Sequence, residues 1–246
     1  GPEDGGHRGL VWSSAHDGGG ASLELVQPGL PNEHGQNWSA SRAVGGTPGR
    51  ANSVRLSNVP PLIVEAHHWP WIPRSNESVV VTTRLIDETP GVRAVVQFRV
   101  DGTTGFLQVP LRDDGAQVDE VAGDGWFSAQ LPAQAPGTVI EWHIEAWDDS
   151  ERRRTWPASV EEDAGAEPSA NALYVVDDEP NPEGDAVFRV VLRAADRAEL
   201  LQINRNRPAA PYPTINQTIS HAHFNGTFVV SANGRTEGRY NVGVRN

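Results

Sequence analysis

The feature that most limits the fold is a series of short apolar segments between residues 60 and 160, separated by Pro-Gly and Asp-Gly turns. The segments follow one another at intervals of about 10–15 residues, a spacing typical of all-β domains. The expected strands are Leu62–His67, Ser78–Leu85, Arg93–Val100, Gly105–Leu111, Gly125–Leu131, Thr138–Trp147 and Arg152–Trp156. The pattern predicts a mostly β chain with a β-sandwich over residues 59–160.

The type of sandwich follows from the sixth segment and from the absence of cysteine. Side chains alternate between the two faces of a strand, so one face of this segment is expected to carry Trp142, Ile144 and Ala146. The other face is expected to carry Glu141, His143, Glu145 and Trp147. With no Cys in the chain, the Cys-Trp-Cys pattern of antibody domains is missing, which favours a sandwich of the fibronectin type III-like or bacterial Ig-like type.

The segments on either side contain fewer apolar residues. Residues 1–58 contain one clear strand, Ser22–Val26, in which Leu23 and Leu25 are expected to be half-buried. The stretch around Trp38 is expected to be an ordered loop anchored by that ring. Residues 161–184 have the acidic, Pro-bearing composition of a linker, with one short strand at Leu173–Val176 that could pair with the sandwich edge.

Residues 185–246 differ again. The pattern predicts a strand at Val187–Leu192 and a short helix at Ala194–Asn204. A hairpin is expected to follow, with strands Phe224–Ser231 and Gly238–Val244. Its turn is Asn233-Gly234, and Asn-Gly is the strongest short-range hairpin signal.

Charge and composition exclude several functions. The chain has 246 residues, 32 acidic against 20 basic, and a formal net charge of −12. This balance argues against nucleic-acid partners and against docking on anionic lipid, and no apolar stretch is long enough for membrane insertion. No lysine is present, so a P-loop is impossible, and no Gly-x-Ser-x-Gly elbow occurs. The lack of methionine leads us to expect an excerpt or a processed product.

Motifs at the two ends resemble known families. Gly18–Leu25, Asn37-Trp38, Gly46–Gly49 and Asn52-Ser53 resemble the last part of a bacterial lamin-tail domain. That resemblance assigns residues 1–58 to the C-terminal part of a β-sandwich carried on secreted surface proteins.

The C-terminal motifs resemble the opening of the spore-coat-protein-H (CotH) kinase-like family. They are Val187–Leu200, Gly226–Phe228 and Tyr240–Arg245. The resemblance implies that residues 185–246 begin a partial α+β domain whose nucleotide-binding and catalytic residues lie further on. No catalytic or cofactor-binding residue is therefore assigned within this chain.

The central segment is similar to an Ig-like module that often sits between lamin-tail and CotH-like domains in large secreted bacterial proteins. The similarity rests on Arg112–Gly115, Ala122–Phe127 and Trp147–Pro157. The order of the three resemblances implies an extracellular location, secreted or on the bacterial cell surface.

An acidic loop is the candidate metal site. Asp113, Asp114, Asp119 and Asp124 lie within 12 residues, and Ca²⁺ takes carboxylate and carbonyl oxygens from such loops. The spacing lacks the regular ligand positions of an EF-hand, so two Asp-Gly turns capped by their own aspartates are the competing interpretation.

Tryptophan supplies the candidate contact surface. Trp69 and Trp71 are expected in a Pro-flanked loop and could form part of a carbohydrate platform, since aromatic rings stack on apolar ligand faces. Core or inter-domain packing is the alternative, because Trp is mostly buried in folded proteins.

Three functional hypotheses remain open. The first is a non-catalytic structural or adhesion segment of a bacterial surface protein, whose partner is a cell-surface or extracellular polymer. The second is a self-assembling subunit of a filament or sheath, completed by strand addition between copies. The third is a fragment of a CotH-like atypical protein kinase that lacks its catalytic part.

Overall fold

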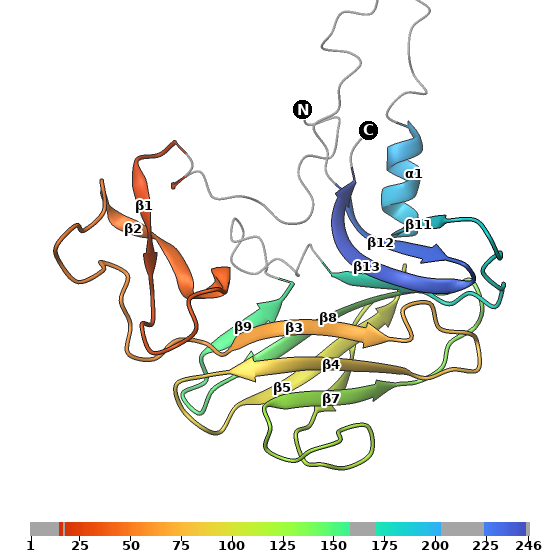
Figure 1. Cartoon of the computed structure of the whole chain (residues 1–246), viewed down its shortest axis with the longest axis horizontal. Helices are drawn as coiled ribbons and strands as arrows, with labels where there is room; N and C mark the ends of the chain where they lie inside the picture. Colours follow the sequence, from red (N-terminus) through yellow and green to blue (C-terminus); the bar gives the residue numbers. More distant parts are fainter. Residues whose placement is uncertain (1–14, 17, 158–170, 203–223, 245–246) are drawn as a thin grey trace, which may run out of the picture.

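The computed structural model describes residues 15–16, 18–157, 171–202 and 224–244. Within these residues the chain is mostly β, with antiparallel sheets and a single α-helix. The predicted fold class is therefore confirmed. The strands form a central sandwich, an N-terminal hairpin and a C-terminal three-stranded sheet (Figure 1).

The central sandwich consists of two antiparallel sheets. The first has the order β3-β4-β7, with bounds β3 Leu62–Trp69, β4 Val79–Ile86 and β7 Trp126–Leu131. The second has the order β10-β8-β5-β6, with β9 also paired to β8. Its bounds are β5 Arg93–Val100, β6 Leu107–Leu111, β8 Val139–Trp147, β9 Arg153–Trp156 and β10 Ala172–Val175. All seven strands expected between residues 60 and 160 are present.

One hydrophobic core lies between the two sheets. It contains Val81 and Leu131 from the first sheet and Phe98 and Trp142 from the second, all in one cluster of buried side chains. The predicted apolar face of β8 is part of this core. The opposite face of β8 is also buried at Glu141, His143 and Glu145, whereas Trp147 is half-buried.

β10 is the strand expected within the linker. It pairs with Val139–Trp142 of β8, while β9 pairs with Ile144–Trp147 of the same strand. The two short strands therefore share one edge of β8, placed end to end.

The N-terminal hairpin differs from the sequence-based expectation. Its strands are β1 (Ala21–Leu25) and β2 (Trp38–Val44), with a short 3₁₀ turn at Gly35–Asn37. Trp38 and Ser39, which the sequence predicts in an ordered loop, are instead the first residues of β2, whose small and polar residues give no strand signal. Trp38 is partly exposed, and the buried anchor beside it is Asn37.

The burial of β1 departs from the prediction at Leu23, whereas Leu25 is half-buried as expected. Leu23 is 49% exposed, whereas Glu24 is 5% exposed. The Glu24 carboxylate accepts hydrogen bonds from Thr47 Oγ1 at 2.5 Å and from Ser53 N at 2.6 Å. Gly46 makes this closure possible, because it has a φ of +75° and a Cβ there would lie 2.2 Å from Ser22 Oγ. A two-stranded hairpin has too little apolar surface for its own core, so hydrogen bonds to a carboxylate hold it together.

The hairpin region packs on the outer face of β3. Leu30 and Val59 form a small apolar cluster with Leu62 and Val64. The Gln36 side chain binds the backbone of Ile63 twice, with Nε2 donating to the carbonyl at 2.6 Å and Oε1 accepting from N–H at 2.9 Å.

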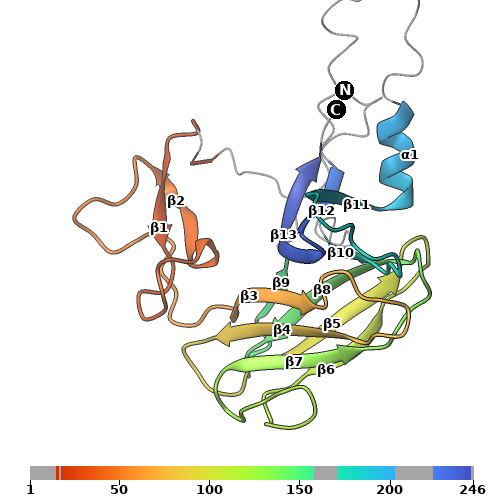
Figure 2. The same ribbon diagram turned by 45° about the vertical axis from the view of Figure 1, so that its right-hand side comes forward.

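The C-terminal sheet has the order β11-β12-β13 and carries the helix α1. The bounds are β11 Val187–Leu192, α1 Ala194–Gln202, β12 Phe224–Ala232 and β13 Arg235–Val244. The predicted turn is present, since Asn233 and Gly234 both have positive φ, 49° and 74°. The expected helix end at residues 203–204 lies outside the described residues. In both views this sheet and the hairpin lie on the same side of the sandwich, separated from each other (Figure 2).

Candidate functional site

The acidic loop between β6 and β7 brings three of its four predicted aspartates together. Ligand oxygens of Asp113, Asp119 and Asp124 lie within 4.8 Å of one another. Asp114 is not part of this group. Its carboxylate instead accepts a hydrogen bond from Ala116 N at 3.1 Å and lies 3.8 Å from Arg112.

The three grouped carboxylates also cap the loop backbone. Asp113 accepts N–H donors from Gly123 at 2.5 Å, Asp124 at 3.3 Å and Gly125 at 2.9 Å. Asp119 is buried and accepts from Gly115 N at 2.5 Å. These bonds are those of the capped-turn interpretation, and the grouping is also compatible with Ca²⁺. The calcium site remains a prediction.

The two predicted contact residues, Trp69 and Trp71, lie against each other. Their rings meet edge to face with centroids 5.4 Å apart. Trp69 is 58% exposed, and Trp71 is half-buried. Trp142, by contrast, is fully buried in the core.

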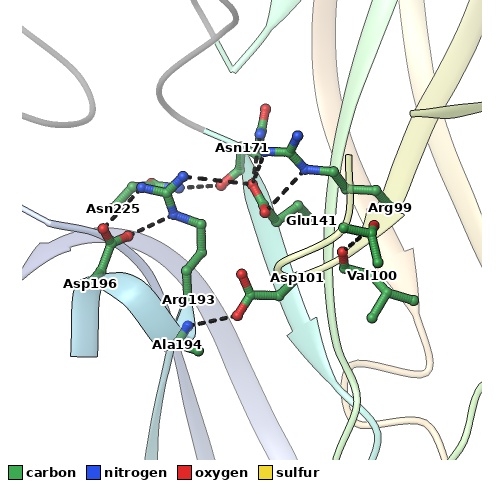
Figure 3. Close-up of polar contacts among 10 residues, drawn as sticks. Arg99, Val100, Asp101, Glu141, Asn171, Arg193, Ala194, Asp196 and Asn225 are labelled. Carbon is green, nitrogen blue, oxygen red and sulfur yellow. Dashed lines mark hydrogen bonds and ion pairs between the residues drawn. The ribbon is translucent and has the colours of Figure 1, made fainter. Parts of the chain in front are cut away.

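A buried polar network on the outer face of β8 was not identified from the sequence (Figure 3). The Glu141 side chain is 2% exposed and receives both Arg99 Nε at 3.2 Å and Arg99 Nη2 at 3.3 Å. Asn171 Nδ2 donates to the same carboxylate at 3.0 Å. The one available signal was Arg99 facing Glu141 across adjacent strands, which becomes visible only once the register is known.

The network continues from the sandwich into the C-terminal sheet and its helix. Arg193 Nη1 lies 3.9 Å from the Glu141 carboxylate. The same guanidinium binds the fully buried Asp196 through two bonds of 2.7 and 2.9 Å. Asp101, which follows β5, accepts a hydrogen bond from Ala194 N at 2.6 Å. We call Arg99, Asp101, Glu141, Arg193 and Asp196 the inter-sheet bridge.

A second contact between the sandwich and the C-terminal sheet lies beside the buried His68 ring. His68 packs against Tyr174 with the rings tilted by 37° and their centroids 4.9 Å apart, and it meets Trp142 edge to face at 5.6 Å. Arg239 of β13 lies over the Trp142 ring, 5.9 Å from its centroid. Burial lowers the pKa of His68 well below its usual value, and the positive charge of Arg239 lowers it further. Burial likewise lowers the pKa of Arg239, to about 10, so Arg239 stays charged at neutral pH.

No protein-family model matches the chain, and no curated protein matches it. The lamin-tail, Ig-like and CotH-like resemblances therefore stay predictions. Among the described residues, no helix combines the length and the apolar character needed to cross a membrane.

Proposed function

We propose that this chain is a non-catalytic structural segment of an extracellular bacterial protein, in which the sandwich holds two flanking units at fixed positions. The observation that supports this most directly is the inter-sheet bridge. Its two carboxylates, Glu141 and Asp196, are buried and each is paired with an arginine, so a placement that separated Arg193 from them would leave buried charge unpaired at a high cost. The hairpin side is fixed independently by Gln36 and by the apolar cluster on β3.

Spin-label distance measurements test this proposal directly. The chain has no cysteine, so Gln108→Cys on β6 and Glu237→Cys on β13, both exposed, give two selective labelling sites. We expect one narrow distance distribution in this double variant, and a broad one when Arg193→Ala is added. A broad distribution without Arg193→Ala contradicts the spacer role.

Self-assembly is a second candidate function, favoured by the outer strand of the C-terminal sheet. β13 is a ten-residue strand, and none of the described strands pairs with its outer edge. Long unpaired edges are templates for strand addition by another chain. Light scattering over a range of concentrations should then detect polymers, and Val242→Lys in β13 should abolish them. A monomer at every concentration contradicts this candidate.

A further inference from the structure

The outer face of the sheet β3-β4-β7 is divided into two unlike halves. The division lies at a bulge between Val64 and His67, where Glu65 has a φ of 53°. Before the bulge, Leu62 and Val64 are covered by the cluster with Leu30. After it, His67 and Trp69 are exposed.

The exposed half carries a row of aromatic rings. The ring centroids of Trp69 and Trp71 lie 5.4 Å apart. The His67 ring lies edge to face against Trp126 of β7, with centroids 6.5 Å apart. His67 and Trp69 are two residues apart on one strand, so they point to the same side about 7 Å apart. We call Trp71, Trp69, His67 and Trp126 the aromatic row. The backbone carbonyl of Trp71 is hydrogen-bonded to Nε2 of the buried His68 at 3.3 Å. This contact helps to hold Trp71 at the end of the row.

Uncharged polar groups lie beside the aromatic row. Thr82 Oγ1 is 3.1 Å from Ser128 Oγ, and Gln130 Nε2 donates to Ser78 Oγ at 2.6 Å. The last three of these residues also line an open groove of about 460 Å³ between β6 and β7. The surface thus places ring faces next to hydroxyl and amide groups, of which Gln130 is exposed, Ser78 and Thr82 are half-buried and Ser128 is buried. The accessible groups can exchange further hydrogen bonds.

Charge decides which occupant this surface fits. The chain as a whole carries −12, yet the polar groups beside the aromatic row are neutral. Charged side chains near the row carry both signs: Glu65 and Arg84 on the neighbouring strands, Arg74 and Glu77 after Trp71, and Arg112 in the groove. A basic or strongly acidic polymer finds no complementary field here. A sugar ring has an apolar C–H face and a rim of hydroxyl groups, which matches rings flanked by neutral donors and acceptors.

We propose that the aromatic row is a binding site for an uncharged polysaccharide chain. The proposal goes beyond the spacer role and does not depend on it, since it rests only on the open half of this sheet face. A protein partner is the competing occupant of an exposed aromatic patch, and the test below separates the two.

The experiment measures depletion of the whole chain by insoluble cellulose and chitin, and its retardation in native gels containing xylan, amylopectin or alginate. We expect binding to at least one of the four neutral polymers and none to alginate, which is anionic. Binding to no neutral polymer, or to alginate alone, overturns the proposal and leaves a protein as the occupant.

Variants locate the binding. Trp69→Ala should weaken it by at least about tenfold, because an exposed ring that contacts a ligand carries much of the binding energy. Trp69→Phe should retain most of the binding. Phe188→Ala is the matched control, since Phe188 is 63% exposed on the C-terminal sheet, and it should change binding by less than about twofold. Unchanged binding in Trp69→Ala, or equal losses in Trp69→Ala and Phe188→Ala, contradicts the site.

Discussion

At the scale of single residues, Asp113 is the central acceptor of the acidic loop. Its carboxylate receives three backbone N–H groups, and unpaired donors raise the free energy of the folded chain. We expect Asp113→Ala to lower the free energy of unfolding by about 1–2 kcal/mol, measured by urea denaturation. Asp114→Ala should cost less than about 0.5 kcal/mol. An equal effect of the two variants contradicts this assignment.

The same two variants decide the calcium prediction. If the grouped carboxylates bind Ca²⁺, adding the ion raises the melting temperature of the natural chain, because a ligand bound only by the folded state stabilises it. The rise should vanish in Asp113→Ala and persist in Asp114→Ala. A calcium titration with no heat and no thermal shift removes the site and leaves the capped turns.

His68 gives the molecule a defined response to acid. Its pKa in the folded chain lies below the value near 6.5 of the unfolded chain, so protons bind the unfolded state more readily. Stability is complete above about pH 6.5 and falls by about 1.4 kcal/mol per pH unit below it, until the folded pKa is reached. His68→Phe should remove this part of the decline between pH 7 and pH 5. The exposed His67→Gln should keep it, and an identical pH profile of His68→Phe and the natural chain contradicts the prediction.

At the scale of elements, β8 shows both the reach and the limit of sequence analysis. Its alternation correctly placed Trp142, Ile144 and Ala146 in the core, because a period of two fixes which side chains share a face. It could not show that the opposite face is covered, since the Arg193 that contacts Glu141 comes from a segment far along the chain. The burial of Glu24 in the hairpin strand β1 could not be predicted for a related reason. Glu24 is buried by Thr47 and Ser53, which no local pattern connects.

The acidic loop and the tryptophans were more accessible to prediction. Aspartates and glycines close in sequence stay close in space, so three of the four predicted residues meet. The Pro-flanked position of Trp69 similarly indicated exposure, whereas its place in a row with His67 of β3 and Trp126 of β7 depends on the sheet register and the bulge.

The buried face of β8 carries a prediction of its own. Glu141→Ala leaves Arg99 without its buried partner, and removing one member of such a pair costs about 3–5 kcal/mol. Glu151→Ala is the matched control, because the Arg93–Glu151 pair is exposed on both sides and should contribute less than about 1 kcal/mol. Chemical denaturation of both variants measures the difference. Similar losses in the two variants contradict a special role of the buried network.

At the scale of the whole molecule, the inter-sheet bridge predicts how the sandwich and the C-terminal sheet unfold. All eight tryptophans lie before residue 157, so their fluorescence reports mainly on the rest of the chain, although Trp142 also contacts Arg239 of β13. Far-UV circular dichroism reports on all strands. Superimposable urea transitions by the two methods are expected for the natural chain. In Arg193→Ala the circular dichroism transition should begin at lower urea, because the C-terminal sheet loses its link to Glu141. Coincident transitions in that variant contradict the coupling.

The shared edge of β8 has a consequence for anyone who shortens this chain. The last strand of the sandwich in the sequence is β10, which begins after residue 171 and pairs with Val139–Trp142 of β8. Truncation at residue 157 therefore leaves four residues of β8 without their hydrogen-bonded neighbour, and such an unpaired edge promotes association with other chains. A truncated chain that ends after Val176 retains β10 and keeps this edge of β8 paired. Aggregation of the shorter chain would then result from the position of the truncation and would give no information about self-assembly of the 246-residue chain.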